Sequence, residues 1–172
     1  MYELDAVKVL LANENNSILY KRLDSNMLNM EKIIVSHSIV YIKSGTVEIE
    51  TYDYKKFTAT QGEMLFMPRD SYLISDYIKE RHEMEVYLFF FDHSFTSEFL
   101  QNNTVKKDST ENRILKLNVS DNILHYIGSL QKMKYQNRNN NHLLKIKIFE
   151  LLHLVCESNE HFIATLRSQE DV

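Results

Sequence analysis

Histidines and carboxylates are the side chains of this 172-residue chain that could bind a metal or transfer protons. The seven histidines form no cluster with the spacing of metal ligands. His82 is followed by Glu83 and Glu85, but residues i, i+1 and i+3 of a strand do not share one face. The sequence therefore predicts no metal site and no cofactor.

Nucleophilic catalysis has equally little support. The single cysteine, Cys156, lies in the apolar run LLHLVCE, and its neighbour His153 is more simply explained by helix packing than by thiol activation. No Gly-X-Ser-X-Gly turn occurs, and the three glycines are too far apart to form a phosphate-binding loop. We expect the chain not to be an enzyme.

Aromatic and apolar residues on predicted strands are the remaining candidates for a site. They would form either a solid core, which is the commoner arrangement, or the wall of a hollow barrel. A hollow barrel would suit a largely apolar small ligand whose carboxylate binds to a polar anchor. The candidate ligand-binding residues are His37, Tyr41, Lys43, Phe66, Arg69, Tyr87 and Phe89.

Short alternating runs predict that these residues lie in an antiparallel β-barrel or sandwich over residues 1–118. Turn residues such as Ser44-Gly45, Gln61-Gly62 and Pro68-Arg69-Asp70 separate the runs. The predicted strands are 33–42, 47–52, 64–67, 72–78 and 84–91.

Helical periodicity replaces the alternation after residue 118. Ser120 is a good N-cap for a helix over about 121–136, and the asparagine-rich run 137–141 separates it from a second helix over 141–157. A third, short helix is predicted at 160–167. The second helix carries a core-facing seam of Leu144, Ile148, Leu151 and Val155.

A second, mixed face of the helix over 141–157 favours contact with another subunit. The alternative is that the chain's own barrel and first helix cover both faces. The candidate dimer-interface residues are Leu143, Ile146, Lys147, Glu150 and Leu154.

Composition also limits the kinds of partner that this chain is expected to bind. The net charge of −4 is unlike that of a domain that neutralises several phosphates, so we expect no nucleic-acid contact by this chain itself. No run approaches the ~18 apolar residues of a membrane span, and the start MYELDAVKVLL is acidic rather than basic. A cytoplasmic protein without membrane contact is expected.

Two stretches, IVYIKSGTVEIETYDYKKFTATQGEMLFMPRDSYLIS (39–75) and LLKIKIFELLHLVCESNEHFIATLRSQ (143–169), resemble AraC/XylS-family transcription regulators. The resemblance is greatest to the ExsA and LcrF group of virulence activators. It implies a mainly β, cupin-like barrel at 1–118, then two or three helices that include a dimerisation segment at 119–168. In that group the dimer contacts correspond to Leu143, Ile146, Lys147 and Leu154 here.

The chain also departs from the family pattern. Metal-binding cupins carry histidines and a glutamate where this sequence has residues such as Ile33, Ser38 and Leu73, so a metal or oxygenase role is not implied. The family's helix-turn-helix pair would follow the sequence given. We expect residues 169–172 to begin the linker to that absent domain, through which the protein would contact DNA.

The leading hypothesis is a regulatory domain of an AraC-type activator that forms homodimers and receives a signal. The signal would be either a fatty-acid-like ligand in the barrel or a protein antiactivator, and the sequence does not choose between them. The alternative is a stand-alone small cupin that binds a metabolite or acts as an isomerase.

Overall fold

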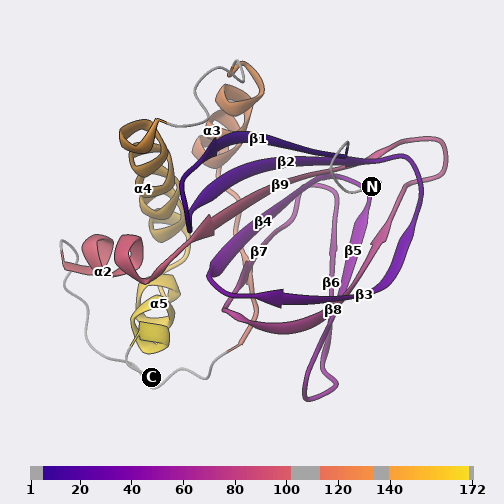
Figure 1. Ribbon diagram of the computed structural model, residues 1–172, viewed down its shortest axis with the longest axis horizontal. Helices are drawn as coiled ribbons and strands as arrows, with labels where there is room; N and C mark the ends of the chain where they lie inside the picture. The colour runs from indigo at the N-terminus through magenta and orange to yellow at the C-terminus, as the bar shows by residue number, and fades with distance from the viewer. Residues whose placement is uncertain (1–5, 102–112, 134–139, 171–172) are drawn as a thin grey trace.

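The computed structural model describes residues 6–101, 113–133 and 140–170 (Figure 1). Two antiparallel sheets face each other as a barrel, and the helices gather on one side of it. The strands are β1 (Val7–Ala12), β2 (Ser17–Leu23), β3 (Met27–Ile34), β4 (His37–Ser44), β5 (Thr46–Thr51), β6 (Lys56–Thr60), β7 (Met64–Met67), β8 (Asp70–Tyr77), β9 (Met84–Phe91) and β10 (Leu115–Leu117). The helices are α2 (His93–Gln101), α3 (Asp121–Gln131), α4 (Asn141–Ser158) and α5 (Phe162–Glu170).

The strand order defines the two sheets. Sheet A has the order β1-β2-β9-β4-β7-β10, and sheet B has the order β3-β8-β5-β6. All neighbouring strands are antiparallel, which confirms the mainly β fold class. The edge strands β1 and β3 have no hydrogen-bonded neighbour on one side among the described residues.

Some elements differ from the sequence-based expectation. The run 33–42 is not one strand, because a turn at Val35-Ser36 divides it between β3 and β4. The first 30 residues, for which no individual strand was predicted, supply β1, β2 and the start of β3. Helix α2 was not predicted, because it is short and directly follows the apolar strand β9.

Sheet A is apolar on both faces, and each face belongs to a different cluster of buried side chains. The outer face contributes residues such as Ile39, Phe66 and Phe89 to a core shared with α3, α4 and α5. The inner face contributes residues such as Val40 and Val86 to a second core against sheet B. The sheet is therefore the middle layer between the helices and sheet B.

The C-terminal helices show the expected cap at Ser120, the expected seam, and a further cap at Asn140. Ser120 and Asn140 accept hydrogen bonds from the backbone N–H groups of Ile123 and Leu143, so each caps its helix. The seam residues of α4 (Leu144, Ile148, Leu151 and Val155) are all fully buried, which confirms the core-facing stripe. Helix α5 continues to Glu170, while residues 134–139 and 171–172 lie outside the described part.

A glycine is required at the tight turn between β4 and β5. Gly45 has φ +95°, and a Cβ atom there would lie 2.6 Å from the carbonyl oxygen of Tyr77 and 2.8 Å from Cγ of Met84. Gly62 also has a positive φ, of +86°, but a Cβ atom would meet nothing within 4 Å. A side chain at Gly62 would therefore introduce backbone strain alone, whereas a side chain at Gly45 would add a steric clash.

We predict that Gly45→Ala lowers the free energy of unfolding by roughly 2–4 kcal/mol, since left-handed strain and overpacking add. Gly62→Ala introduces only the backbone strain and is expected to lower the free energy of unfolding by about 1–2 kcal/mol. Gly128→Ala, in helix α3 and without a clash, is the control and should stabilise by about 0.5–1 kcal/mol. Urea titrations would measure all three. Equal losses at positions 45 and 62 would contradict the clash.

Candidate ligand-binding cavity

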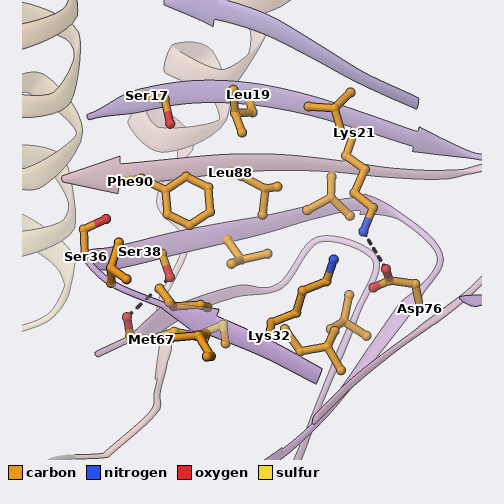
Figure 2. Close-up of a pocket in the computed structure, with 18 of the residues that line it drawn as sticks. Ser17, Leu19, Lys21, Lys32, Ser36, Ser38, Met67, Asp76, Leu88 and Phe90 are labelled. Atoms are coloured by element: carbon orange, nitrogen blue, oxygen red, sulfur yellow. Dashed lines mark hydrogen bonds and ion pairs between the residues drawn. The ribbon is translucent and has the colours of Figure 1, made fainter. Parts of the chain in front are cut away.

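The space between the two sheets is hollow. A cavity of about 470 Å³ lies in the barrel, a volume within the range of small-molecule sites (Figure 2). Its walls are mostly apolar and come from the inner faces of both sheets. They include Leu19, Val40, Val47, Ile49, Met67, Ile74, Val86, Leu88 and Phe90.

The burial of the side chains along β9 reflects the position of the cavity. It lies between β2 and β4, so both of its neighbours are in place. Tyr87, Phe89 and Phe91 on its outer face are buried against the helices, yet Leu88 and Phe90 on its inner face stay only partly buried. Because successive strand residues face opposite sides, this difference shows that the inner face meets open space at Leu88 and Phe90, whereas Val86 on the same face is buried.

Charged side chains gather at one end of the apolar space. Nζ of Lys21, on β2, lies 2.7 Å from Oδ2 of Asp76, on β8, so this ion pair joins sheet A to sheet B. The Lys21 and Asp76 side chains are 18% and 7% exposed. Figure 2 shows Lys32, on β3, reaching into the same part of the cavity.

The cavity opens between the β1–β2 turn and the β3–β4 turn. Ile33 and Val35, which line this mouth, are 80% and 82% exposed despite their apolar side chains. On the other side, the buried Asn16 accepts a 2.7 Å hydrogen bond from the backbone N–H of Asp92. Asp92 in turn accepts a hydrogen bond from the backbone N–H of Phe95, so the mouth is tied to the start of α2.

Most of the residues predicted to bind a ligand lie on the opposite face of sheet A. His37 contacts the rings of Phe66 and Phe91, and Phe89 contacts Tyr126 of α3. Tyr41 and Tyr87 are also buried in the core beside the helices. None of these predicted residues lines the cavity, and ligand binding by them remains an untested prediction.

The two predicted cationic anchors are also outside the cavity lining. Lys43 lies 3.5 Å from the carboxylate of Glu85 on the outer face, where Glu85 also accepts a hydrogen bond from Tyr20. Burial is the main cause that raises the pKa of the Tyr20 hydroxyl, followed by this hydrogen bond. Arg69 is exposed in the turn before β8.

Sequence reasoning missed Lys21, Lys32 and Asp76, although a signal was present. Lys21 lies on the same face of β2 as the apolar Leu19 and Leu23. Asp76 lies on the same inward face of β8 as Tyr72 and Ile74. A charged residue at an apolar phase of a strand needs a partner or a ligand, since an unpaired buried charge is costly.

Helix α4 presents the predicted dimer residues at its surface. Ile146 is 61% exposed and Glu150 is exposed, whereas Leu143, Lys147 and Leu154 are partly buried. Nζ of Lys147 lies 3.5 Å from the Glu150 carboxylate and 5.7 Å from the ring centre of Tyr126. These residues form one mixed face, as expected, and dimerisation through this face stays a prediction.

The described residues offer little for catalysis. They hold no group of three or more His, Cys, Asp or Glu side chains arranged to bind a metal ion. Burial raises the pKa of the Cys156 thiol to about 11, so at neutral pH it is protonated and a poor nucleophile.

Comparison with known proteins identifies the family. Residues 37–165 match the ExsA N-terminal regulatory domain. The chain belongs to this family. Among curated proteins, none matches the sequence.

Solved structures support the same conclusion at the level of the fold. Apo ToxT K231A from Vibrio cholerae superposes with a TM-score of 0.64 at 12% identity, over 87% of this chain and 59% of ToxT. Wild-type ToxT with a bound unsaturated fatty acid gives a TM-score of 0.55 at 13% identity, over 85% of this chain and 57% of ToxT. This chain therefore spans less than two thirds of ToxT and has the fold of an AraC-type regulatory domain.

The expectation of an antiparallel barrel followed by helices is confirmed by the two sheets and by α3, α4 and α5. A cupin superfamily protein from Desulfitobacterium hafniense matches 50% of this chain and 75% of its own length, with 13% identity and a TM-score of 0.42. In the described ranges, no helix combines the length and the apolar character that a membrane crossing demands.

Filling the cavity should block the uptake of an apolar fluorescent dye. We predict that Leu88→Trp, which places a large ring in the open space, reduces dye binding at least tenfold with little change in melting temperature. Its neighbour Phe89 is the matched control on the other face. Phe89→Leu should lower the melting temperature but leave the dye affinity within about twofold, since it disturbs only the helix-side core. Unchanged dye binding in Leu88→Trp would show that the dye does not enter the barrel.

Proposed function

We propose that this chain is the sensing and dimerisation domain of an AraC-type transcription activator, and that its barrel binds a fatty-acid-like ligand. The observation that carries the proposal is the hollow, apolar interior with lysine side chains at one end. An apolar chain would lie along Leu88, Val40 and Ile49. The carboxylate would lie near Lys21 and Lys32.

Physical chemistry favours this class of ligand. Apolar walls stabilise a hydrocarbon chain in proportion to the area removed from water. A carboxylate hydrogen-bonded to an ammonium group in a partly dehydrated site gains more than it would at an exposed surface. ToxT, which shares the fold, is described with a bound unsaturated fatty acid, and this supports the proposal by analogy.

The regulatory output would depend on a region outside the sequence given. The chain covers 59% of the length of apo ToxT, and its net charge of −4 does not favour contact with DNA. Under the proposal, DNA is contacted by a helix-turn-helix domain elsewhere in a cytoplasmic protein. Ligand binding would alter that activity only if the ligand binds two conformations of the domain with different affinity.

Two other hypotheses make different predictions. A protein antiactivator would bind to the outside of the domain and would not compete with a ligand in the barrel. A stand-alone cupin that binds a metabolite or acts as an isomerase would be supported by a stoichiometric transition metal in elemental analysis of the purified protein.

We predict that delipidated protein binds dodecanoate and that Lys32→Met weakens this binding at least tenfold, which corresponds to the loss of one charge-assisted hydrogen bond. Calorimetry would measure the dissociation constants. Lys55→Met is the control, because Lys55 is a highly exposed cation in the β5–β6 turn and should not affect binding. Absence of dodecanoate binding by the wild-type protein would refute the ligand class.

The dimer is tested separately by light scattering. We predict a wild-type mass twice that of one chain, and the mass of one chain for Ile146→Asp, because an exposed apolar residue at the interface is replaced by a charge. The double variant Ile146→Asp/Leu154→Asp should give the same result. Tyr52→Asp, which replaces an exposed aromatic residue in the β5–β6 turn, is the control and should remain dimeric. A monomeric wild-type protein would remove the dimerisation proposal without affecting the ligand site.

A further inference from the structure

The cavity-lining residues of sheet A form three rows that run across β2, β9 and β4. Residues that pair across neighbouring strands share one face of a sheet, so the strand register fixes the order of these rows. The rows are, in order, Ser17 with Phe90 and Ser38, then Leu19 with Leu88 and Val40, then Lys21 with Val86. This wall of the cavity is therefore polar at one end, apolar in the middle and charged at the other end.

The polar end, which we call the serine end, consists of Ser17, Ser36 and Ser38. Ser36 reaches it from the turn before β4, and Figure 2 shows all three serines at the opposite end of the cavity from Lys21. Ser36 is 9% exposed and Ser38 is 0% exposed, so this end lies inside the mouth and not on the outer surface. Four residues along β2 separate Ser17 from Lys21, which corresponds to about 13 Å.

The hydroxyl groups at the serine end have hydrogen-bonding capacity that the protein does not use. Oγ of Ser38 donates to the carbonyl oxygen of Met67 at 3.3 Å, so its lone pairs can still accept. The hydroxyls of Ser17 and Ser36 make no hydrogen bond to any other group that the structure describes, and each can both donate and accept. Because a hydroxyl removed from bulk water costs free energy unless it is hydrogen-bonded, this end favours a polar ligand atom.

A purely hydrocarbon tail does not satisfy these groups. If the carboxylate of the ligand lies beside Lys21, the other end of a chain that crosses the apolar row lies at the serine end. A methyl group there would cover the hydroxyls of Ser17 and Ser36 and leave them without a partner, whereas a hydroxyl group would bond to them. A neutral hydroxyl also fits better than a second carboxylate, since serine side chains supply no positive charge.

We propose that the cavity selects an aliphatic carboxylate that carries a hydroxyl group at the far end of its chain, and that Ser17 and Ser36 bind this hydroxyl. The proposal rests on the function proposed above, because it presumes that a carboxylate occupies the charged end of the barrel. It narrows the ligand class from simple fatty acids to chains that are polar at both ends.

Three ligands with the same carbon chain test the proposal. They are dodecanoate, 12-hydroxydodecanoate and the isomer 2-hydroxydodecanoate, whose hydroxyl lies beside the carboxylate. Calorimetry on the delipidated protein gives the three dissociation constants. We expect the wild-type protein to bind 12-hydroxydodecanoate at least as tightly as dodecanoate, although the added hydroxyl makes the free ligand more hydrophilic.

The double variant Ser17→Ala/Ser36→Ala should weaken the binding of 12-hydroxydodecanoate at least fivefold, since each lost hydrogen bond corresponds to roughly a twofold to tenfold change in affinity. The affinities for dodecanoate and 2-hydroxydodecanoate should change less than twofold. Ser71→Ala is the matched control, because Ser71 is exposed on β8 and does not line the cavity, and it should leave all three affinities unchanged. A thermal melt establishes folding, and each single variant should show part of the loss if the double variant does not fold.

The outcomes distinguish this proposal from the one on which it rests. If the wild-type protein binds none of the three ligands, the proposed function fails. If it binds dodecanoate at least tenfold more tightly than 12-hydroxydodecanoate, the role of the serine end is overturned while the fatty-acid-like ligand class stands. The same conclusion follows if the folded double variant keeps its full affinity for 12-hydroxydodecanoate, or loses affinity for all three ligands equally.

Discussion

Sheet A has to present apolar side chains on both of its faces, and the other layers are arranged around this requirement. On the outer side, helices α3, α4 and α5 remove the aromatic residues of β4, β7 and β9 from water. On the inner side, sheet B approaches but does not fill the space, and a cavity of about 470 Å³ remains. The hydrophobic effect thus holds the helical layer firmly against sheet A, while the space between the two sheets is left partly unfilled.

Buried charges at one end of the cavity are stabilised because Lys21 and Asp76 form an ion pair. Lys21 and Asp76 come from different sheets, so their ion pair connects the two walls at the place where apolar contact between them is incomplete. Replacing such a pair with apolar residues is often neutral or stabilising, so stability alone does not explain its presence.

The mouth of the cavity and the helical layer share structural elements. The β1–β2 turn lines the mouth and, through Asn16, is hydrogen-bonded to the residue that caps α2. Helix α2 packs beside α5, where the guanidinium of Arg167 donates to the carbonyl oxygen of Leu100. The start of α2 therefore connects one wall of the cavity to the helical layer.

Alternation, turn residues and caps in the sequence were sufficient to predict the barrel, the helices that follow it and the buried seam of α4, because these depend on local periodicity. They were not sufficient to say which face of sheet A is inside the barrel. Both faces are apolar, so His37, Phe66 and Phe89 looked as suitable for a ligand as Val40 and Leu88. Only the tertiary structure decided this, because the docking of the helices assigns one face to the core and leaves the other to the cavity. The pairing of Lys21 with Asp76, 55 residues apart, likewise depends on how the two sheets meet and not on any local pattern.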